Sequence, residues 1–439
     1  MKIDIIATLL VVLLFSCKNK EGTERIAVQK KVGTHTIYAL NADEIPKGEG
    51  IIAIIGATLI NGTGSAPVEN SLVILQNDII DFVGKMGERE IEEDATVIDA
   101  QGMTLLPGLI DAHFHGGKHA EMSTLFLKKG VTSVRDPGAW NASYDSARNS
   151  GRPIPRLFLT GPHIDVYPPA YPENSYLIQD AEEGRIAVNR FADEGATAIK
   201  AYFRLSTEMI AAICDEAHKR GIPVTAHLEI THAMDAIKAG LDGVEHVTSF
   251  GTALLPLEEA EIYKNKVMAD NEARRSGRYE VWNELDMDNS VLMDTLIQLL
   301  VDRKTFVSPT LAVFERQPDR GDSVAVNGFA NMLKFVGKAK KAGAKVVVGS
   351  HTWVPYADTG DAYYREMELL HKAGLSKMQT IEAATLENAK FFRIDSRLGS
   401  IEKGKIADLI LLRENPLDDL KALKTVEQVV LNGVLCEFQ

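Results

Sequence analysis

The sequence predicts an α/β protein with a (β/α)8 barrel of the TIM-barrel type and a small β-sandwich domain. Two observations support this fold class. Between residues 104 and 395, eight β-like runs alternate with helical stretches. Short alternating strands precede this region at 50–103 and return at 396–439. Because the two ends of a barrel chain lie close together, we expect the flanks to combine into one sandwich-like domain.

The eight predicted barrel strands are short apolar or alternating runs that end near Gly, Pro or polar residues. One intervening helix is expected to begin after Ser206, as its N-cap, and to stop at Gly221. The piece from Phe250 to Lys304 is too long for a simple connection, so it is expected to carry extra helices and to act as a lid. In chain order, the strand runs are TLLPGLIDAHFH, VTSVRD, RLFLTGP, ATAIKAYF, IPVTAHLEI, DGVEHVTSF, TFVSPTLAV and AKVVVGSH.

The N-terminus predicts export. An apolar run from Ile5 to Phe15 is too short to span a bilayer and fits a secretion signal. Cys17 follows at once, in a pattern that resembles a bacterial lipoprotein cleavage box, so residues 1–17 are predicted to be a lipoprotein signal peptide with a lipid anchor on Cys17. The alternatives are an ordinary signal peptide or an uncleaved anchoring helix. Residues 18–49 are expected to form a tether, and the protein to be periplasmic or associated with the outer membrane.

Charge and cysteine content exclude some classes of protein and partner. The 439 residues carry a formal net charge of −13 and no basic cluster, so nucleic-acid binding is not expected. Cys214 and Cys436 are isolated and are predicted to be buried thiols rather than a disulfide framework. The sequence leaves the oligomeric state open.

Histidines gather where the predicted barrel strands end. In a barrel, functional side chains stand at the carboxyl ends of the strands. One buried histidine is usually a packed core residue, but several imidazoles buried together are costly unless a cation satisfies them. The pattern therefore predicts a divalent metal site, with Zn²⁺ as the default and Mn²⁺, Fe²⁺ or Ni²⁺ also suited. The residues at these ends are His113, His115, Lys200, His227, His246 and His351.

Four segments together resemble the metal-dependent amidohydrolase superfamily, and most closely its imidazolonepropionase- and prolidase-like branch. The resemblance covers nearly all of the chain from Ile51 onward. It rests on the paired histidines of the first segment and on the glycine- and lysine-containing tail of the last. The segments are LLPGLIDAHFHG, IKAYFRLSTEMIAAICDEAHKRGIPVTAH, AGLDGVEHV and IEAATLENAKFFRIDSRLGSIEKGKIADLILLRENPL.

The resemblance implies a metal centre with two ions, by default two Zn²⁺. His113 and His115 would bind the more buried metal, and His227 and His246 the second. Lys200 would be carbamylated by CO₂ and bridge both ions, which requires a neutral amine. The alternative interpretation is that Lys200 is a buried lysine that forms an ion pair. A metal-bound hydroxide would be the nucleophile.

A nearby carboxylate adds one further expectation. Asp111 lies two residues before His113, on the same side of the strand. It is expected either to orient a ligand imidazole or to satisfy local backbone groups.

The chain departs from the family pattern at the eighth strand. The family reads Gly-Thr-Asp there, whereas this chain reads Gly349, Ser350 and His351. The favoured interpretation is that His351 takes over as metal ligand or catalytic base. Alternatively, Asp358 or Asp361 supplies the carboxylate, or efficient hydrolysis is lost.

The predicted loops beyond the strands supply candidates for substrate binding. These residues would line a partly apolar pocket, although loop packing explains each one singly. Arg204 could pair with a substrate carboxylate or cap a helix. The candidates are His163, Tyr167, Tyr171, Arg204, Trp353 and Tyr356.

The predicted function is hydrolysis of an amide or peptide-type C–N bond in a small-molecule substrate. A dipeptide, an acyl-amino acid and a cyclic amide all remain open. One alternative is a lactone, ester or phosphoester hydrolase that uses the same centre. The other is a metal- or solute-binding surface protein whose catalysis is impaired by His351.

Overall fold

The computed structural model describes residues 36–438. The predicted signal peptide, the lipid anchor at Cys17 and the first part of the expected tether therefore lie outside the described residues. The last part of that tether packs against the domain. The backbone N–H of Leu40 donates to Leu157 O at 2.8 Å, and the side-chain amide of Asn41 donates to Pro155 O at 3.0 Å. The ordered domain thus begins before residue 50.

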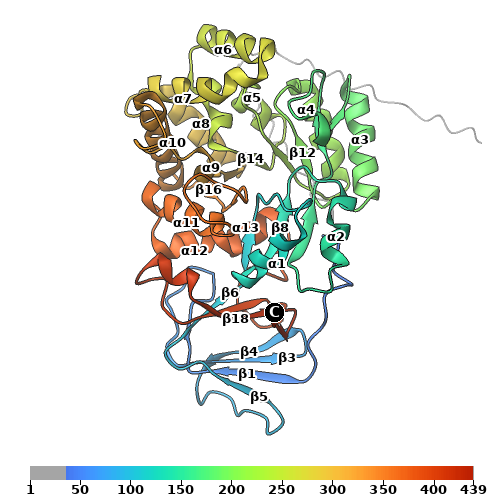
Figure 1. The fold of residues 1–439 in the computed structure, drawn as a ribbon, viewed down its shortest axis with the longest axis vertical. Coiled ribbons are helices and arrows are strands. Elements are labelled where there is room, and N and C mark those ends of the chain that lie inside the picture. The colour runs from blue at the N-terminus through green and yellow to red at the C-terminus, as the bar shows by residue number, and fades with distance from the viewer. Residues whose placement is uncertain (1–35, 439) are drawn as a thin grey trace, which may run out of the picture. The chain divides into compact units, whose positions relative to one another are not determined.

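Parallel strands and their helices form the larger part of the described chain, a TIM-barrel-like α/β fold (Figure 1). A three-stranded parallel sheet has the order β7-β8-β9, and a seven-stranded parallel sheet has the order β11-β10-β12-β13-β14-β15-β16. Their bounds are β7 Leu109–Asp111, β8 Val131–Asp136, β9 Arg156–Leu159, β10 His163–Asp165, β11 Ser175–Leu177, β12 Ile199–Ala201, β13 Val224–Ala226, β14 Gly243–Glu245, β15 Phe306–Ser308 and β16 Lys345–Val346.

The two parallel sheets approach each other at both edges. The N–H of Thr197, just before β12, donates to Leu159 O in β9 at 2.8 Å. The N–H of Ala112, just after β7, donates to Val348 O beyond β16 at 2.9 Å. The assigned strands do not form a closed ring in the described residues, so the closed eight-stranded barrel stays a prediction. Strands β10 and β11 extend the third predicted run beyond what its pattern indicated.

The two flanks form two further sheets, which lie next to each other in Figure 1. Ile54 and Val73 of one sheet share an apolar cluster with Leu105, Leu409 and Val430 of the other. A sandwich remains a prediction for this pair. The first sheet has the order β4-β3-β1-β5, with β1 Ile51–Ile55, β3 Ser71–Gln76, β4 Ile79–Lys85 and β5 Thr96–Asp99. The second has the order β19-β18-β17-β6-β2, with β2 Thr58–Leu59, β6 Thr104–Pro107, β17 Leu409–Leu412, β18 Val426–Leu431 and β19 Val434–Leu435.

The first predicted barrel strand is divided between the two regions. Its start, β6, pairs antiparallel with β17 and parallel with β2, whereas β7 pairs with β8. Gly108 separates them, and a Cβ at this position would collide with the side chain of Thr132. A glycine therefore lets the backbone pass close to Thr132 where the chain moves from one sheet to the other.

Helices follow most of the parallel strands. Ser206 accepts a hydrogen bond from Met209 N and caps α4 as predicted, and α3 and α4 lie side by side (Figure 1). None of the helices within residues 36–438 is long and apolar enough to cross a bilayer. The α-helices are α1 Ala120–Lys128, α2 Asp145–Arg148, α3 Ala181–Asp193, α4 Thr207–Lys219, α5 Ala233–Lys238, α6 Leu257–Ala269, α7 Arg274–Glu284, α8 Val291–Arg303, α9 Leu311–Phe314, α10 Ser323–Lys341, α11 Ala362–Ala373, α12 Lys377–Ala384 and α13 Leu386–Phe392.

The long piece between β14 and β15 holds the extra helices α6, α7 and α8, as expected. Helix α8 begins where Ser290 accepts a hydrogen bond from Met293 N. It ends at Lys304, whose backbone is left-handed. Helix α7 brings arginine side chains to the cavity described next.

Candidate metal centre and active site

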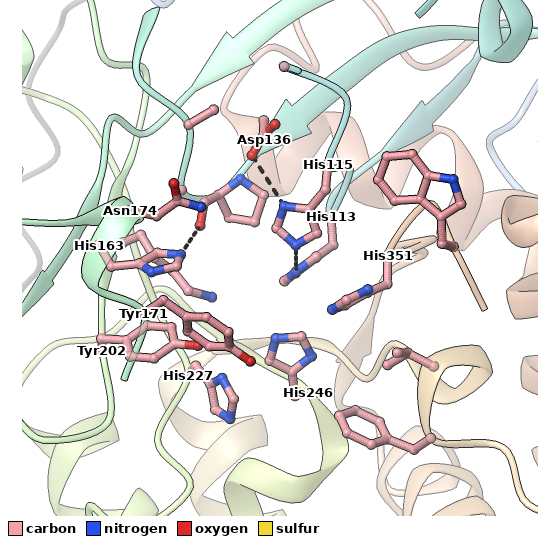
Figure 2. Close-up of a pocket in the computed structure, with 18 of the residues that line it drawn as sticks. His113, His115, Asp136, His163, Tyr171, Asn174, Tyr202, His227, His246 and His351 are labelled. Atoms are coloured by element: carbon pink, nitrogen blue, oxygen red, sulfur yellow. Dashed lines mark hydrogen bonds and ion pairs between the residues drawn. The ribbon is translucent and has the colours of Figure 1, made fainter. Parts of the chain in front are cut away.

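A cavity of about 500 Å³ opens among the carboxyl ends of the parallel strands. This volume is in the range of small-molecule sites. Figure 2 shows that imidazoles from several strands point toward one another in it. The fold therefore brings together side chains that are far apart in sequence. Of the predicted metal-site residues, all six line the cavity: His113, His115, Lys200, His227, His246 and His351.

His113 and His115 follow β7 and form the centre of the cluster (Figure 2). Their Nε2 atoms lie 3.0 Å apart. On the far side of each ring, Nδ1 faces a carboxylate: Glu245 at 3.1 Å for His113 and Asp136 at 3.4 Å for His115. A facing carboxylate favours the proton on Nδ1, which leaves both Nε2 lone pairs directed at one another. A cation between or beside them would relieve this repulsion.

His227 and His246 follow β13 and β14, and each has one ring nitrogen held by the protein. Glu229 accepts from His227 Nε2 at 2.8 Å, so that the buried Nδ1 keeps its lone pair and has no partner within the described residues. His246 Nδ1 lies 2.7 Å from the Thr310 hydroxyl, which itself donates to Pro309 O at 2.8 Å. The hydroxyl must therefore accept from Nδ1–H, which leaves the lone pair of His246 Nε2 free to bind a metal.

His351 belongs to the same cluster. Its ring stacks on that of His113, with centroids 5.2 Å apart and planes 10° apart. The N–H of His351 donates to His113 O at 2.7 Å, its backbone φ is +59°, and its side chain lines the cavity. One ligand nitrogen from each of His113, His246 and His351 lies within 4.8 Å of the other two, which is compatible with a shared metal ion.

The other carboxylates suggested for the strand-8 role are placed differently. Asp361 forms ion pairs with Lys129 and Lys424. Neither Asp358 nor Asp361 lines the cavity, and both border a separate hollow. The geometry therefore favours His351, rather than Asp358 or Asp361, as the metal ligand or catalytic base of the eighth strand.

Lys200, in β12, is fully buried beside the histidines. Its ammonium forms an ion pair with Glu245 of β14. Glu245 also accepts from the Thr225 hydroxyl at 2.8 Å. Burial lowers the pKa of Lys200 well below its usual value, and the charge of Arg135 lowers it further. Both the ion-paired form and a neutral, reactive amine are thus available, and carbamylation stays a prediction.

Burial also keeps the imidazoles neutral. It lowers the pKa of His113, His246 and His351 well below the usual value, and that of His227 to about 4. The neutral imidazole is the form that binds metals. Several neutral rings with converging lone pairs fit a divalent cation, and the donor set suits Zn²⁺ or a similar ion.

Asp111 acts on the backbone rather than on an imidazole. Its Oδ1 accepts from His113 N and from Ser350 N, each at 2.9 Å. Burial raises the pKa of this carboxyl to about 6. Asp111 thus fixes the end of β7 against the segment that carries His351.

Sequence reasoning missed three acidic residues of the site. Asp136 ends β8, lines the cavity and accepts from the Tyr144 hydroxyl at 2.7 Å. Reading the end of every strand for acids as well as histidines would have found it. Glu245 stands immediately before His246, so the same reading applies. Glu229 sits in a loop with φ of +24°, and no sequence signal marks it.

The predicted substrate residues divide into two groups. His163, Tyr171 and Trp353 line the cavity, and the His163 ring stacks on Tyr202 with centroids 4.3 Å apart. The structure does not bring the other three there. Tyr167 is 82% exposed, Arg204 donates to the side chain of Asn271 at 3.1 Å, and the Tyr356 hydroxyl donates to Asp319 at 3.0 Å.

Comparison with known proteins decides the family. The amidohydrolase family pattern matches residues 104–436, which is most of the chain. The chain belongs to the amidohydrolase family. Members are metal-dependent, in agreement with the histidine cluster, and this amidohydrolase is accordingly a hydrolase that acts on C–N bonds.

Relatives and solved structures agree with this assignment. Ochratoxinase from Aspergillus niger is 24% identical over 455 residues, covering 87% of this chain and 85% of the relative. A Xaa-Pro dipeptidase with methionine bound in its active site has a TM-score of 0.68 at 23% identity, covering 89% of this chain and 100% of that one. Molinate hydrolase has a TM-score of 0.69 at 20% identity, and the match covers 90% of this chain and 96% of that one. These structural likenesses establish the fold.

Proposed function

We propose that this amidohydrolase is an exported enzyme that cleaves an amide or peptide-type C–N bond in a dipeptide, an acyl-amino acid or a cyclic amide. The observation that carries the proposal is the convergence of five histidines and one lysine, from five strand ends, on a single cavity. The names of relatives that act on amide-containing compounds, ochratoxinase and a Xaa-Pro dipeptidase, support the bond type.

The residues that would hold metal follow from the free ring nitrogens. His113, His246 and His351 would hold one ion, and His115 stands beside it. His227 and Lys200 complete the donor set, the latter as a carbamate if CO₂ adds to its amine. When bound, a divalent ion polarises the substrate carbonyl and lowers the pKa of water.

The chain's own groups would then position the substrate and move protons. His163 Nε2 lies 3.1 Å from Pro137 O, a group that only accepts, so Nε2 carries the proton. Its buried Nδ1 has no partner within the described residues and can accept a hydrogen bond from a substrate N–H. His351 can fill only one of two roles, because a neutral imidazole has a single lone pair. Bound to the ion, it carries its proton on the other ring nitrogen and accepts none; unbound, this partly buried imidazole can accept a proton released by water.

Export rests on the N-terminal sequence alone. The apolar run and Cys17 support a lipoprotein that is held in the periplasm or at the outer membrane by a lipid anchor. Globomycin-sensitive processing of the expressed precursor, followed by mass analysis of the N-terminal peptide, tests it. An unmodified N-terminal peptide on mature protein would overturn this part of the proposal.

The activity is tested by metal analysis together with a substrate panel. Purified protein reconstituted with Zn²⁺ or Mn²⁺ is assayed on acyl-amino acids, dipeptides, cyclic amides, lactones and phosphoesters. We expect bound metal, cleavage of an amide substrate, and loss of metal and activity in Lys200→Ala. Cleavage confined to lactones or phosphoesters, or a protein that binds no metal, would overturn the proposal. Growth with ¹³CO₂ and NMR detection of a carbamate signal tests the state of Lys200.

A further inference from the structure

The cavity is cationic although the protein is acidic. The chain has a formal net charge of −13, yet the one acidic side chain in the described lining is Asp136. A low-dielectric cleft lined by one sign of charge concentrates ligands of the opposite sign. The basic residues of the lining, apart from Lys200, are Lys118, Arg274, Arg275, Arg278 and Arg316.

Two arginines of helix α7 already have acidic partners. Arg278 Nε lies 3.6 Å from Glu229, which also accepts from the Tyr263 hydroxyl at 3.0 Å. Glu229 thus provides Arg278 with an acidic partner inside the fold. Arg275 is exposed and forms an ion pair with Glu272.

Arg274 differs from both. It is only 3% exposed, and no carboxylate within the described residues lies within 4.0 Å of its guanidinium. Its one side-chain hydrogen bond runs from Nη2 to the Tyr171 hydroxyl at 2.7 Å, and its buried Nε has no partner among residues 36–438. The acid whose charge acts on Arg274, Glu229, is already ion-paired with Arg278, so the buried guanidinium of Arg274 has no carboxylate of its own and this position favours an anion.

Arg274 is also placed at a suitable reach from the metal-binding imidazoles. The guanidinium lies 5.7 Å from the centre of the Phe203 ring, and that ring lies 5.3 Å from the His227 ring. These two distances place the Arg274 guanidinium no more than about 11 Å from the His227 ring. A small substrate can place its scissile bond at the histidines and an anionic group a few bonds away at Arg274.

We propose that Arg274 binds the free carboxylate of the substrate, which makes N-acyl-amino acids and dipeptides, rather than uncharged cyclic amides, the substrate class. This inference rests on the proposed hydrolase function and sharpens it. A guanidinium can hold a carboxylate with two parallel hydrogen bonds, which also fixes the orientation of the neighbouring amide. The Tyr171 hydroxyl would hold the guanidinium in place.

A matched pair of substrates isolates the role of the charge. Release of acetate is measured from N-acetyl-L-phenylalanine and from N-acetyl-L-phenylalaninamide, which differ only at the carboxylate. The wild type should prefer the acid, and Arg274→Gln should lower kcat/KM for the acid about 100-fold while changing that for the amide less than threefold. Arg275→Gln, whose exposed side chain is ion-paired with Glu272, should reduce the preference for the acid far less than Arg274→Gln does. An acid preference that persists in folded, metal-loaded Arg274→Gln would overturn the inference.

A binding measurement separates this inference from the proposed hydrolysis. N-benzyl-L-phenylalanine contains no amide to cleave, and N-benzyl-phenethylamine lacks only its carboxylate. Calorimetry on metal-loaded protein should find tighter binding of the acid, and Arg274→Gln should abolish the difference. If that result holds but no substrate is cleaved, the proposed hydrolysis fails and the carboxylate site stands. If both ligands bind alike to the wild type, the carboxylate site fails.

Discussion

Replacing His351 tests whether this histidine holds a metal. The change His351→Asn removes the imidazole but suits the backbone, because Asn tolerates the φ of +59° found here better than Ala does. Three ring nitrogens within 4.8 Å become two. Loss of a group that merely orients a ligand lowers metal affinity 10–100-fold, so loss of a ligand should lower it by about 100-fold or more, or about 2.7 kcal/mol.

The assay is competition for Zn²⁺ with a chromophoric chelator, run beside hydrolysis of the best substrate. His371→Asn is the control, because His371 lies in helix α11, its Nδ1 lies 2.7 Å from Leu375 O and it does not line the cavity. His351→Asp should retain more metal than His351→Asn, because it returns the carboxylate of the family pattern. Metal affinity within threefold of the wild type in His351→Asn would refute the ligand role. If hydrolysis were lost at the same time, proton transfer would be the remaining role for His351.

Three further changes probe the supports of the site and the fold. Thr310→Val removes the acceptor for His246 Nδ1–H and should weaken Zn²⁺ binding 10–100-fold in the same competition; unchanged affinity would contradict the assigned tautomer. Buried Arg156 donates to Asp408 at 2.7 and 3.0 Å, and Asp408→Asn removes this counter-charge. The free energy of unfolding, measured with urea, should fall by about 3–5 kcal/mol. A fall below about 1 kcal/mol would argue against a stabilising ion pair between β9 and the flank. Burial raises the pKa of Glu366 from 4.5 to about 8. The contribution of this carboxyl to stability is therefore full below about pH 4.5, the pKa of the unfolded chain, and is lost as the pH rises through about 8. The Tm of Glu366→Gln should fall less than the Tm of the wild type between about pH 5 and 8, and parallel Tm curves would contradict this.

Much of the fold and the cluster could be read from the sequence because both rest on local patterns. Strand runs, helix stops and the Ser206 cap depend on residues close in sequence, and the expected cap is present. A histidine at the end of a parallel strand reaches the same edge as its neighbours, so His113, His227 and His246 could be grouped from the sequence alone.

The errors of detail arise where a non-local contact decides. The first run divides at Gly108 because its start pairs with strands of the flank and its end pairs with β8. Residues 36–49 have the composition of a tether, yet Asn41 is held by the backbone at Pro155. Arg204, not Arg274, looked like the substrate residue because it follows Lys200 in sequence, whereas its guanidinium contacts Asn271.

The sequence by itself determined the family, the strand ends and the departure at His351, because these follow from residue type and short spacing. Only the tertiary structure decided which ring nitrogens keep a free lone pair, which acids pair with Lys200 and His227, and which arginine is buried without an ion pair. Those properties depend on partners from distant segments, such as Glu245 beside Lys200 and helix α7 above the cavity. Charge, burial and hydrogen bonding act through space, and their outcome is fixed only when the chain has folded.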